Sequence, residues 1–419
     1  MISLSIHNFG CRVNQAEALL WADTFQEKGI KLKRDFYQSD YVLINSCTLT
    51  HRSDRDVKKF IKRVSRSNPR AKIIVTGCLV ERAYDELEAM PQTWHLFRNS
   101  DKNDLAARVL SLIPSQEKAL PHGHFRSRAL LKIQDGCNFQ CTFCIIPSVR
   151  GKSVSLSPEE ILSQGKRFIS QGFKEIVLTG IHICSYGHDL KPKRNFLGLL
   201  QEIEKIEGLR KVRLSSLDPR FLNVPLLHHL TTSQKICPHF HLSLQNGADE
   251  VLGRMGRKIK VADYQRILAS LRKKSPQASL GADVIVGFPG ESEENFENTF
   301  RFLQESPLTY FHVFPYSSRP GTVASLWSQI DEKIKKKRVS HLRRLSKQKN
   351  FEFRLKFLGK ELEGIVIKKE DDRAEVLTSN YFKVVVPCCP SLEKEEVKVK
   401  IQKVTLNETF GVMASTRSS

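Results

Sequence analysis

The amino-terminal part of the chain repeats one layout three times: an apolar segment, a cysteine at its end, and then a helical pattern. This alternation is typical of a parallel β-sheet covered by helices, so we expect an α/β unit here. The apolar segments are Ser3–Cys11, Tyr41–Cys47 and Lys72–Cys78, and the helical patterns lie at Gln15–Lys28, Asp54–Ser65 and Glu81–Met90.

The three cysteines at the segment ends are Cys11, Cys47 and Cys78. Taken alone, each is a small side chain that a core could bury. Neighbouring strands lie ~5 Å apart, so equivalent positions would bring the thiols together at the carboxyl edge of the sheet, where open α/β sheets bind ligands. Three converging thiolates can hold iron, and we expect an iron–sulfur cluster at this edge.

A second cysteine group has the spacing C-x3-C-x2-C: Cys137, Cys141 and Cys144 follow the apolar segment Ala129–Ile133. Three thiolates this close can surround a four-iron cube but leave one iron without a protein ligand. An open iron can bind a small molecule, which indicates chemistry rather than a structural role. Zinc is the alternative, yet structural zinc takes four ligands, and no nearby His or Cys completes such a set.

The surroundings of this loop resemble the radical S-adenosylmethionine (SAM) enzymes, in which the open iron binds SAM and an electron from the cluster cleaves it. Residues 136–151 read GCNFQCTFCIIPSVRG and resemble the methylthiotransferases of that group. Residues 10–15, 45–48 and 75–78 are similar to the cysteine motifs of the family's amino-terminal domain. The resemblance implies two 4Fe–4S clusters: a catalytic SAM cluster on Cys137, Cys141 and Cys144, and an auxiliary cluster on Cys11, Cys47 and Cys78.

Six further strand-like segments, separated by helical patterns, follow in the middle of the chain. Six β/α units make three-quarters of a (β/α)8 barrel, and an open barrel of this kind resembles the radical SAM core. The segments are Ala129–Ile133, Glu175–Ile181, Lys211–Leu217, His239–Leu244, Leu280–Phe288 and Tyr310–Tyr316.

Residues at the strand ends of such a barrel face its ligand site. The fifth segment breaks into a turn at 287–290 that contains Gly and Pro, and it resembles the fifth-strand motif that packs near the SAM adenine. A tight strand-to-helix corner is the alternative for this turn. The resemblance implies SAM contacts from Phe143, Gly180, Ser215, Gln245, Ile285 and Gly287.

The carboxy-terminal part changes character: three β-forming segments, at 361–367, 384–387 and 396–401, have no helical pattern between them. They predict a small β-barrel that resembles the RNA-binding TRAM domain. The fold class we expect is therefore α/β: an amino-terminal methylthiotransferase domain at 1–114, a linker at 115–128, a radical SAM partial barrel at 129–356 and a TRAM-like domain at 357–419.

The chain is strongly basic: Lys and Arg outnumber Asp and Glu by 67 to 45. An excess of 22 positive charges favours a polyanionic partner. Residues 52–72 contain nine basic and two acidic side chains, and residues 331–356 contain eleven and three. A solvated helix face is the alternative for each, but we expect RNA contacts. With no run of about 18 apolar residues, we expect a soluble cytoplasmic protein.

The segment at 310–317, with Gly321 and Thr322, resembles the branch of the family that acts on N6-threonylcarbamoyladenosine at position 37 of tRNA and forms its 2-methylthio derivative. This implies as partners the tRNA anticodon stem-loop, a reducing electron donor and a sulfur donor of unknown identity. Three alternatives stay open: the branch acting on isopentenyladenosine-37, the branch acting on a ribosomal-protein aspartate, and a non-catalytic RNA-binding protein stabilised by metal.

A threonylcarbamoyl group carries a carboxylate, so its pocket should offer a cation. We expect Arg150 or Arg319 at the open face of the barrel to supply it. A phosphate contact or a plain surface charge is the alternative for either residue.

Overall fold

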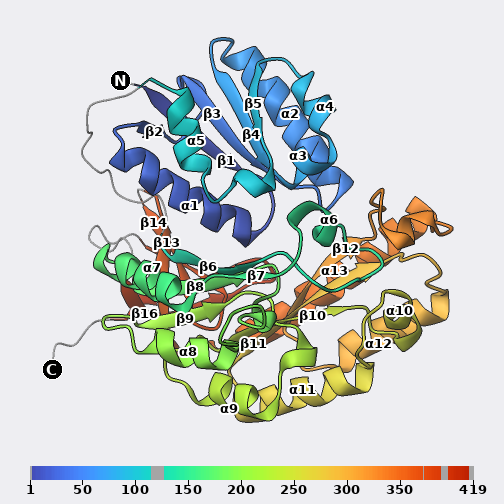
Figure 1. Ribbon diagram of the computed structural model, residues 1–419. Helices are drawn as coiled ribbons and strands as arrows, with labels where there is room; N and C mark the ends of the chain where they lie inside the picture. Colours follow the sequence, from blue (N-terminus) through green and yellow to red (C-terminus); the bar gives the residue numbers. More distant parts are fainter. Residues whose placement is uncertain (1, 115–126, 371, 388–394, 415–419) are drawn as a thin grey trace.

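The computed structural model describes residues 2–114, 127–370, 372–387 and 395–414. The fold is α/β, as the sequence predicts: an amino-terminal parallel sheet, an open β/α barrel and a closed carboxy-terminal β-barrel (Figure 1). Residues 115–126 of the expected linker lie outside the described residues. Two further cysteines, Cys388 and Cys389, which belong to neither cysteine group, also lie outside them. No helix within the described ranges is long and apolar enough to cross a membrane.

The amino-terminal unit comprises β1 Ser3–Asn8, α1 Arg12–Glu27, β2 Lys31–Lys33, β3 Tyr41–Ser46, α2 His51–Ser67, β4 Lys72–Gly77, α3 Cys78–Arg82, α4 Tyr84–Glu88, β5 Thr93–Phe97 and α5 Leu105–Leu112. Its strands are parallel in the order β2-β1-β3-β4-β5. Apolar side chains of α1 and α5, such as Phe25 and Val109, pack on one face of the sheet. Side chains of α2, α3 and α4, such as Ile61 and Leu79, pack on the other.

One helix prediction in this unit was wrong in its bounds. The single helix expected at 81–90 is two short helices that begin earlier, at Cys78, and are interrupted at Ala83, whose backbone is not helical (φ −138°, ψ 46°). Gly77 caps the first of them with a positive φ of 102°, which suits glycine. The sequence pattern also failed to predict β2, β5 and α5. Strand β2 has only three residues, too few to show a periodic pattern.

The central unit comprises β6 Ala129–Asp135, α6 Ile146–Arg150, β7 Val154–Ser155, α7 Pro158–Ser170, β8 Glu175–Gly180, α8 Phe196–Glu204, β9 Lys211–Leu214, α9 Val224–Thr232, β10 His239–Gln245, α10 Asp249–Arg254, α11 Val261–Lys274, β11 Ser279–Val286, α12 Glu293–Glu305, β12 Tyr310–Pro315 and α13 Glu332–Leu355. Six parallel strands form its wall in the order β6-β8-β9 and β10-β11-β12. Isolated bridges, Val212 to Ile236 and Leu217 to Leu242, connect the two halves. All six predicted strands are present.

Helix α1 belongs to two cores at once. One side packs on its own sheet, and the other places Ala16 against Leu130 of β6 and Val177 of β8. Figure 1 shows α1 lying between the amino-terminal sheet and the barrel. The start of this helix, next to Cys11, is therefore held at the boundary between the two units.

The carboxy-terminal unit comprises β13 Glu361–Lys369, β14 Arg373–Thr378, β15 Lys383–Pro387, β16 Glu396–Val404 and β17 Thr409–Met413. These strands close into a barrel in the order β13-β14-β15-β17-β16. Arg213 of β9 ties it to the central unit: this fully buried side chain pairs with Glu175 at 2.8 Å and donates to the carbonyls of Thr378 and Ser379 at 3.2 and 3.0 Å.

Candidate functional site

The first cysteine group lies at the carboxyl edge of three neighbouring strands. Cys11 follows β1 and precedes α1, Cys47 follows β3, and Cys78 begins α3 directly after β4. The strand order changes direction between β1 and β3, and open α/β sheets bind ligands at such a switch point. All three residues line one cavity of about 360 Å³, which also reaches residues of the barrel.

Glycine makes the close approach of two of these cysteines possible. Gly10 has a φ of 111°, and a Cβ at that position would lie 2.5 Å from Cβ of Cys47 and 2.8 Å from its sulfur. Any larger residue would push Cys47 away from Cys11. Glycine at this position thus lets Cys47 lie against the backbone next to Cys11.

The second cysteine group forms a loop that other elements of the barrel hold in place. The backbone N–H of Thr142 donates to the carbonyl of Met255 at 3.1 Å, and that of Cys144 donates back to Cys141 at 3.0 Å. Gly136, just before Cys137, has a φ of 66°, and a Cβ there would lie 2.0 Å from the carbonyl oxygen of Lys152. These contacts fix the path of the loop around its cysteines.

Positive charge surrounds this loop. Arg220 and Arg257 both pair with the buried Asp218, at 2.6 and 3.4 Å, and the guanidinium of Arg220 lies 4.2 Å from the ring centroid of Phe139 in the loop. Burial alone would raise the pKa of Asp218, but hydrogen bonds from His182 and Arg220 and the charge of Arg257 hold it well below its ordinary value. An anchored carboxylate of this kind keeps both arginines beside the cysteines, where they would stabilise a negatively charged cluster.

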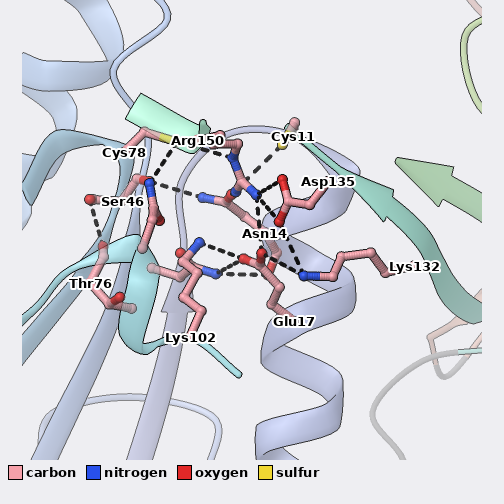
Figure 2. A network of polar contacts seen from close by, with 12 residues as sticks. Cys11, Asn14, Glu17, Ser46, Thr76, Cys78, Lys102, Lys132, Asp135 and Arg150 are labelled. Atoms are coloured by element: carbon pink, nitrogen blue, oxygen red, sulfur yellow. Dashed lines mark hydrogen bonds and ion pairs between the residues drawn. The ribbon is translucent and has the colours of Figure 1, made fainter. Parts of the chain in front are cut away.

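Helix α6 connects the two cysteine groups. It begins just after Cys144, and Ile145 and Val149 pack against Cys78 of the other group. Its last residue, Arg150, donates from Nε to the sulfur of Cys78 at 3.2 Å and from Nη2 to Oδ1 of Asn14 (Figure 2). A five-residue helix therefore places the groups from two units next to each other.

The guanidinium of Arg150 is the centre of a buried ion network (Figure 2). Its Nη1 contacts Asp135 at 2.7 Å and Glu17 at 3.1 Å, and Glu17 also pairs with Lys102 at 2.6 Å and Lys132 at 3.3 Å. Burial would raise the pKa of Glu17, but the charges of Lys102, Arg150 and Lys132 hold it well below its ordinary value. The network joins α1 to the end of β6 and to α6.

This geometry overturns the expected role of Arg150 and Arg319 as free cations for a substrate carboxylate. Both guanidinium groups are 1% exposed. The charge of Arg150 is neutralised by the ion network described above. Arg319 pairs with Asp54 at 2.7 Å, and Asp54 also pairs with Arg82. The sequence could not reveal these partners because they lie far away along the chain; both arginines bind the amino-terminal unit to the barrel.

Cys47 and Cys78 are buried, and the other four cysteines of the two groups are partly exposed. Burial raises the pKa of Cys47 to about 11 and that of Cys144 to about 12. Thiols with such values stay protonated at neutral pH unless a metal displaces the proton. A set of soft sulfur donors with glycine-shaped backbone and flanking arginines fits iron–sulfur ligation. That the six cysteines are the ligands stays a prediction.

The structure separates the expected SAM residues into two places. Gly180 and Ser215 line the cavity. Phe143 and Ile285 pack together with Phe288 in a small apolar cluster beside the second cysteine loop. The other two have positive φ angles: Gln245, at 77°, is the last residue of β10, and Gly287, at 69°, follows the end of β11. Their roles in binding SAM also stay predictions.

Several cavity residues were not singled out by the sequence analysis. They are Arg12, His239, His241, Asp283, Tyr310 and Tyr381. Asp283 lies on β11, two positions before Ile285, and burial raises its pKa to about 6 against the opposing charges of His312 and Arg12. Tyr381 comes from the turn between β14 and β15, so no pattern near the barrel strands could have indicated it.

Comparison with known proteins matches both large units to families. Residues 131–303 match the Radical SAM superfamily, and residues 3–97 match the Uncharacterized protein family UPF0004. The solved radical S-adenosylmethionine methyltransferase TsrM from Kitasatospora setae, with cobalamin and a 4Fe–4S cluster bound, has a TM-score of 0.53 at 13% identity, over 78% of this chain and 77% of that one. At this identity the likeness supports the fold alone.

Curated relatives cover nearly the whole chain. The Threonylcarbamoyladenosine tRNA methylthiotransferase MtaB of Aquifex aeolicus is 38% identical over 91% of this chain and 96% of its own length. MtaB of Bacillus subtilis is 36% identical, with 96% and 94% covered. The tRNA-2-methylthio-N(6)-dimethylallyladenosine synthase of Desulfitobacterium hafniense is 30% identical, with 96% and 95% covered.

Replacing either cysteine group with alanine should remove one cluster and leave the other, because the groups sit on separate loops. In protein reconstituted without oxygen, each triple variant (Cys11, Cys47 and Cys78, or Cys137, Cys141 and Cys144) should bind roughly half of the wild-type iron. Only the second should lose reductive SAM cleavage. Iron analysis and SAM-cleavage assays measure both effects. Full iron in either variant, or stoichiometric zinc in place of iron in the wild type, would contradict the assignment.

Proposed function

Because the chain belongs to the tRNA methylthiotransferases of the radical SAM superfamily, we propose that it converts N6-threonylcarbamoyladenosine at position 37 of tRNA to its 2-methylthio derivative. The two relatives reported above that are named for this substrate share 38% and 36% sequence identity with this chain. The relative named for dimethylallyladenosine shares 30%. The substrate, an anticodon stem-loop, would place the reaction in the cytoplasm.

The observation that carries the proposal is the position of the two cysteine groups on either side of one helix. Methylthio transfer needs a radical at the adenine carbon and a sulfur delivered to it, so the two sources must reach one substrate. Helix α6 follows the second group and packs on Cys78 of the first. Ile146 of this helix lines the same cavity as Cys11 and Cys47.

The cofactors are SAM and two 4Fe–4S clusters. We assign the SAM cluster to Cys137, Cys141 and Cys144, and the auxiliary cluster to Cys11, Cys47 and Cys78. When bound, the SAM cluster would supply the electron that cleaves one SAM, a second SAM would supply the methyl group, and the auxiliary cluster would present the sulfur. An external reductant and a sulfur donor complete the reaction.

The protein's own side chains orient and shield these centres. Arg220 and Arg257, fixed by Asp218, flank the SAM loop and favour the charged state of its thiolates. Arg150 donates to Cys78 and keeps α6 against α3. Residues of the amino-terminal unit, among them Cys11, Asn14 and Leu49, form one wall of the cavity.

We further propose that α2 supplies a contact surface for the tRNA backbone. Arg55, Lys59 and Lys62 are exposed on its outer face, line one hollow with His51, and have no acidic partner among the described residues. By contrast, several cations of α13 serve the fold. Arg338 pairs with Glu291 at 2.6 Å, for example. Of the two basic stretches, the one on α2 is therefore better suited to bind phosphates.

Deleting the carboxy-terminal barrel is not a clean test of RNA binding. Arg213 is fully buried and donates to carbonyls of Thr378 and Ser379, so truncation would expose the Glu175 pair and alter the cavity wall. Charge-neutralising substitutions on the surface separate RNA contacts from such structural effects.

The substrate is decided by two tRNAs that differ only at position 37. Reconstituted enzyme is incubated with SAM, a reductant, sulfide and tRNA carrying either threonylcarbamoyladenosine or isopentenyladenosine, and the nucleosides are analysed by mass spectrometry. We expect the methylthio product from the first tRNA and none from the second. Product from the isopentenyl tRNA alone would mean that the chain acts in the other branch.

The α2 surface is tested by the salt dependence of tRNA binding. The triple variant Arg55→Gln, Lys59→Gln, Lys62→Gln should bind tRNA more weakly, and the slope of log affinity against log salt should fall by about 0.7–0.9 for each phosphate that the variant no longer neutralises. The matched control removes three charges from α11, at the opposite end of the molecule in Figure 1: Arg266→Gln, Lys273→Gln, Lys274→Gln. Equal slopes in the two variants would exclude α2 as a contact surface.

A further inference from the structure

The cavity between the units holds one guanidinium whose charge no carboxylate in the described ranges pairs with. Its wall contains two arginines, Arg12 and Arg150. Arg150 forms ion pairs with Asp135 and Glu17. Arg12, partly exposed at the first position of α1, hydrogen-bonds to a phenol and forms no ion pair with any described residue.

The histidines of the wall add no positive charge near neutral pH. Burial lowers the pKa of His241 to about 4 and that of His239 well below its ordinary value. Burial, together with the nearby His241, lowers the pKa of His312 as well. Among the described lining residues, Arg12 is therefore the unpaired cation that an anionic group would meet, with the carboxyl of Asp283 in the same wall.

Tyr381 of the carboxy-terminal barrel fixes the position of Arg12. Nη2 of Arg12 donates to the phenol oxygen of Tyr381 at 2.8 Å. The ring of Tyr381 stacks on His239, with centroids 3.9 Å apart and planes at 17°. Its backbone has a φ of 70°, a conformation that non-glycine residues rarely adopt. Three units of the chain thus meet at this guanidinium.

The remaining donors of Arg12 suit a carboxylate. A guanidinium has five N–H donors in a planar fork, and a carboxylate accepts two of them in parallel. Among the described residues, Arg12 donates one hydrogen bond, to Tyr381, and its other N–H groups are available. Tyr310, which is hydrogen-bonded to the buried His239 at 2.7 Å, lines the same cavity and offers an aromatic ring of the kind a base packs on.

We propose that Arg12, held by Tyr381, binds the carboxylate of the threonylcarbamoyl group and so distinguishes the modified adenosine from adenosine without this group. The inference rests on the proposed function and names the specificity-determining residue for it. It gives the carboxy-terminal barrel a part in substrate selection, through Tyr381, beyond any grip on the RNA backbone.

A phosphate contact is the competing role for Arg12, and the two roles have different signatures. Loss of a phosphate contact weakens binding of every tRNA alike. Loss of a carboxylate contact weakens binding only where the carboxylate is present. Comparing one tRNA with and without the modification separates them.

The test measures the affinity of the reconstituted holoenzyme for tRNA bearing threonylcarbamoyladenosine-37 and for the same tRNA with unmodified adenosine. A charge-assisted, bidentate contact predicts that the wild type prefers the modified tRNA by about 10- to 100-fold. Arg12→Gln should lose most of this preference by weakening binding of the modified tRNA alone. Arg12→Lys should keep a part of it, and the exposed control Arg266→Gln should keep all of it.

Iron content is measured on every variant, because Arg12 adjoins Cys11. If Arg12→Gln loses iron, the proposal is tested with Tyr381→Phe instead. This variant removes only the hydroxyl that orients the guanidinium of Arg12. This variant should lose preference by about 3- to 10-fold with its iron intact. Full preference in Tyr381→Phe or in iron-replete Arg12→Gln, or equal weakening for both tRNAs, would overturn the proposal. A wild type without any preference would instead count against the proposed substrate.

Discussion

The buried guanidinium of Arg150 is the interaction on which the relation between the two cysteine groups depends. It ends the helix that follows the second cysteine loop, and it reaches Glu17 of the amino-terminal unit, Asp135 of the barrel and the sulfur of Cys78. A charge in such surroundings is stable only while its partners stay in place. The two units therefore keep one relative position, and the cavity between them keeps its shape.

The same cavity gathers residues from all three parts of the chain. The amino-terminal unit contributes the first cysteine group and Arg12, the barrel contributes Asp283 and the strand-end residues, and the carboxy-terminal barrel contributes Tyr381. The last contribution depends on Arg213, which binds the carbonyls just before Tyr381 while paired with Glu175. The carboxy-terminal β-barrel is in this way part of the site.

Much of this architecture was predictable from local patterns. The strand-and-helix alternation indicated the parallel sheet, and the strand-end cysteines came together as neighbours. The α/β class and the closed carboxy-terminal barrel were likewise confirmed.

What local patterns could not give is which distant side chains meet. Arg150 and Arg319 were expected to face the substrate, but their partners Glu17 and Asp54 lie more than 100 residues away along the chain. Periodicity places a residue on a face of its own element and carries no information about charges on another. Tyr381 was missed for the same reason, since its place in the cavity depends on how two units dock.

Hydrogen–deuterium exchange of an Arg150→Met variant tests the joining role of this arginine most directly. Removing one partner of a buried ion network costs about 3–5 kcal/mol. Exchange should therefore accelerate by about 100-fold or more both in the first turns of α1 and in α6, while the central strand β3 keeps its protection. The matched control is Arg167→Met, which removes the ion pair with Asp23 at the more exposed end of the same boundary, and it should leave both segments unchanged. Unaltered exchange of α1 and α6 in Arg150→Met would show that the two cysteine groups are held together by something else.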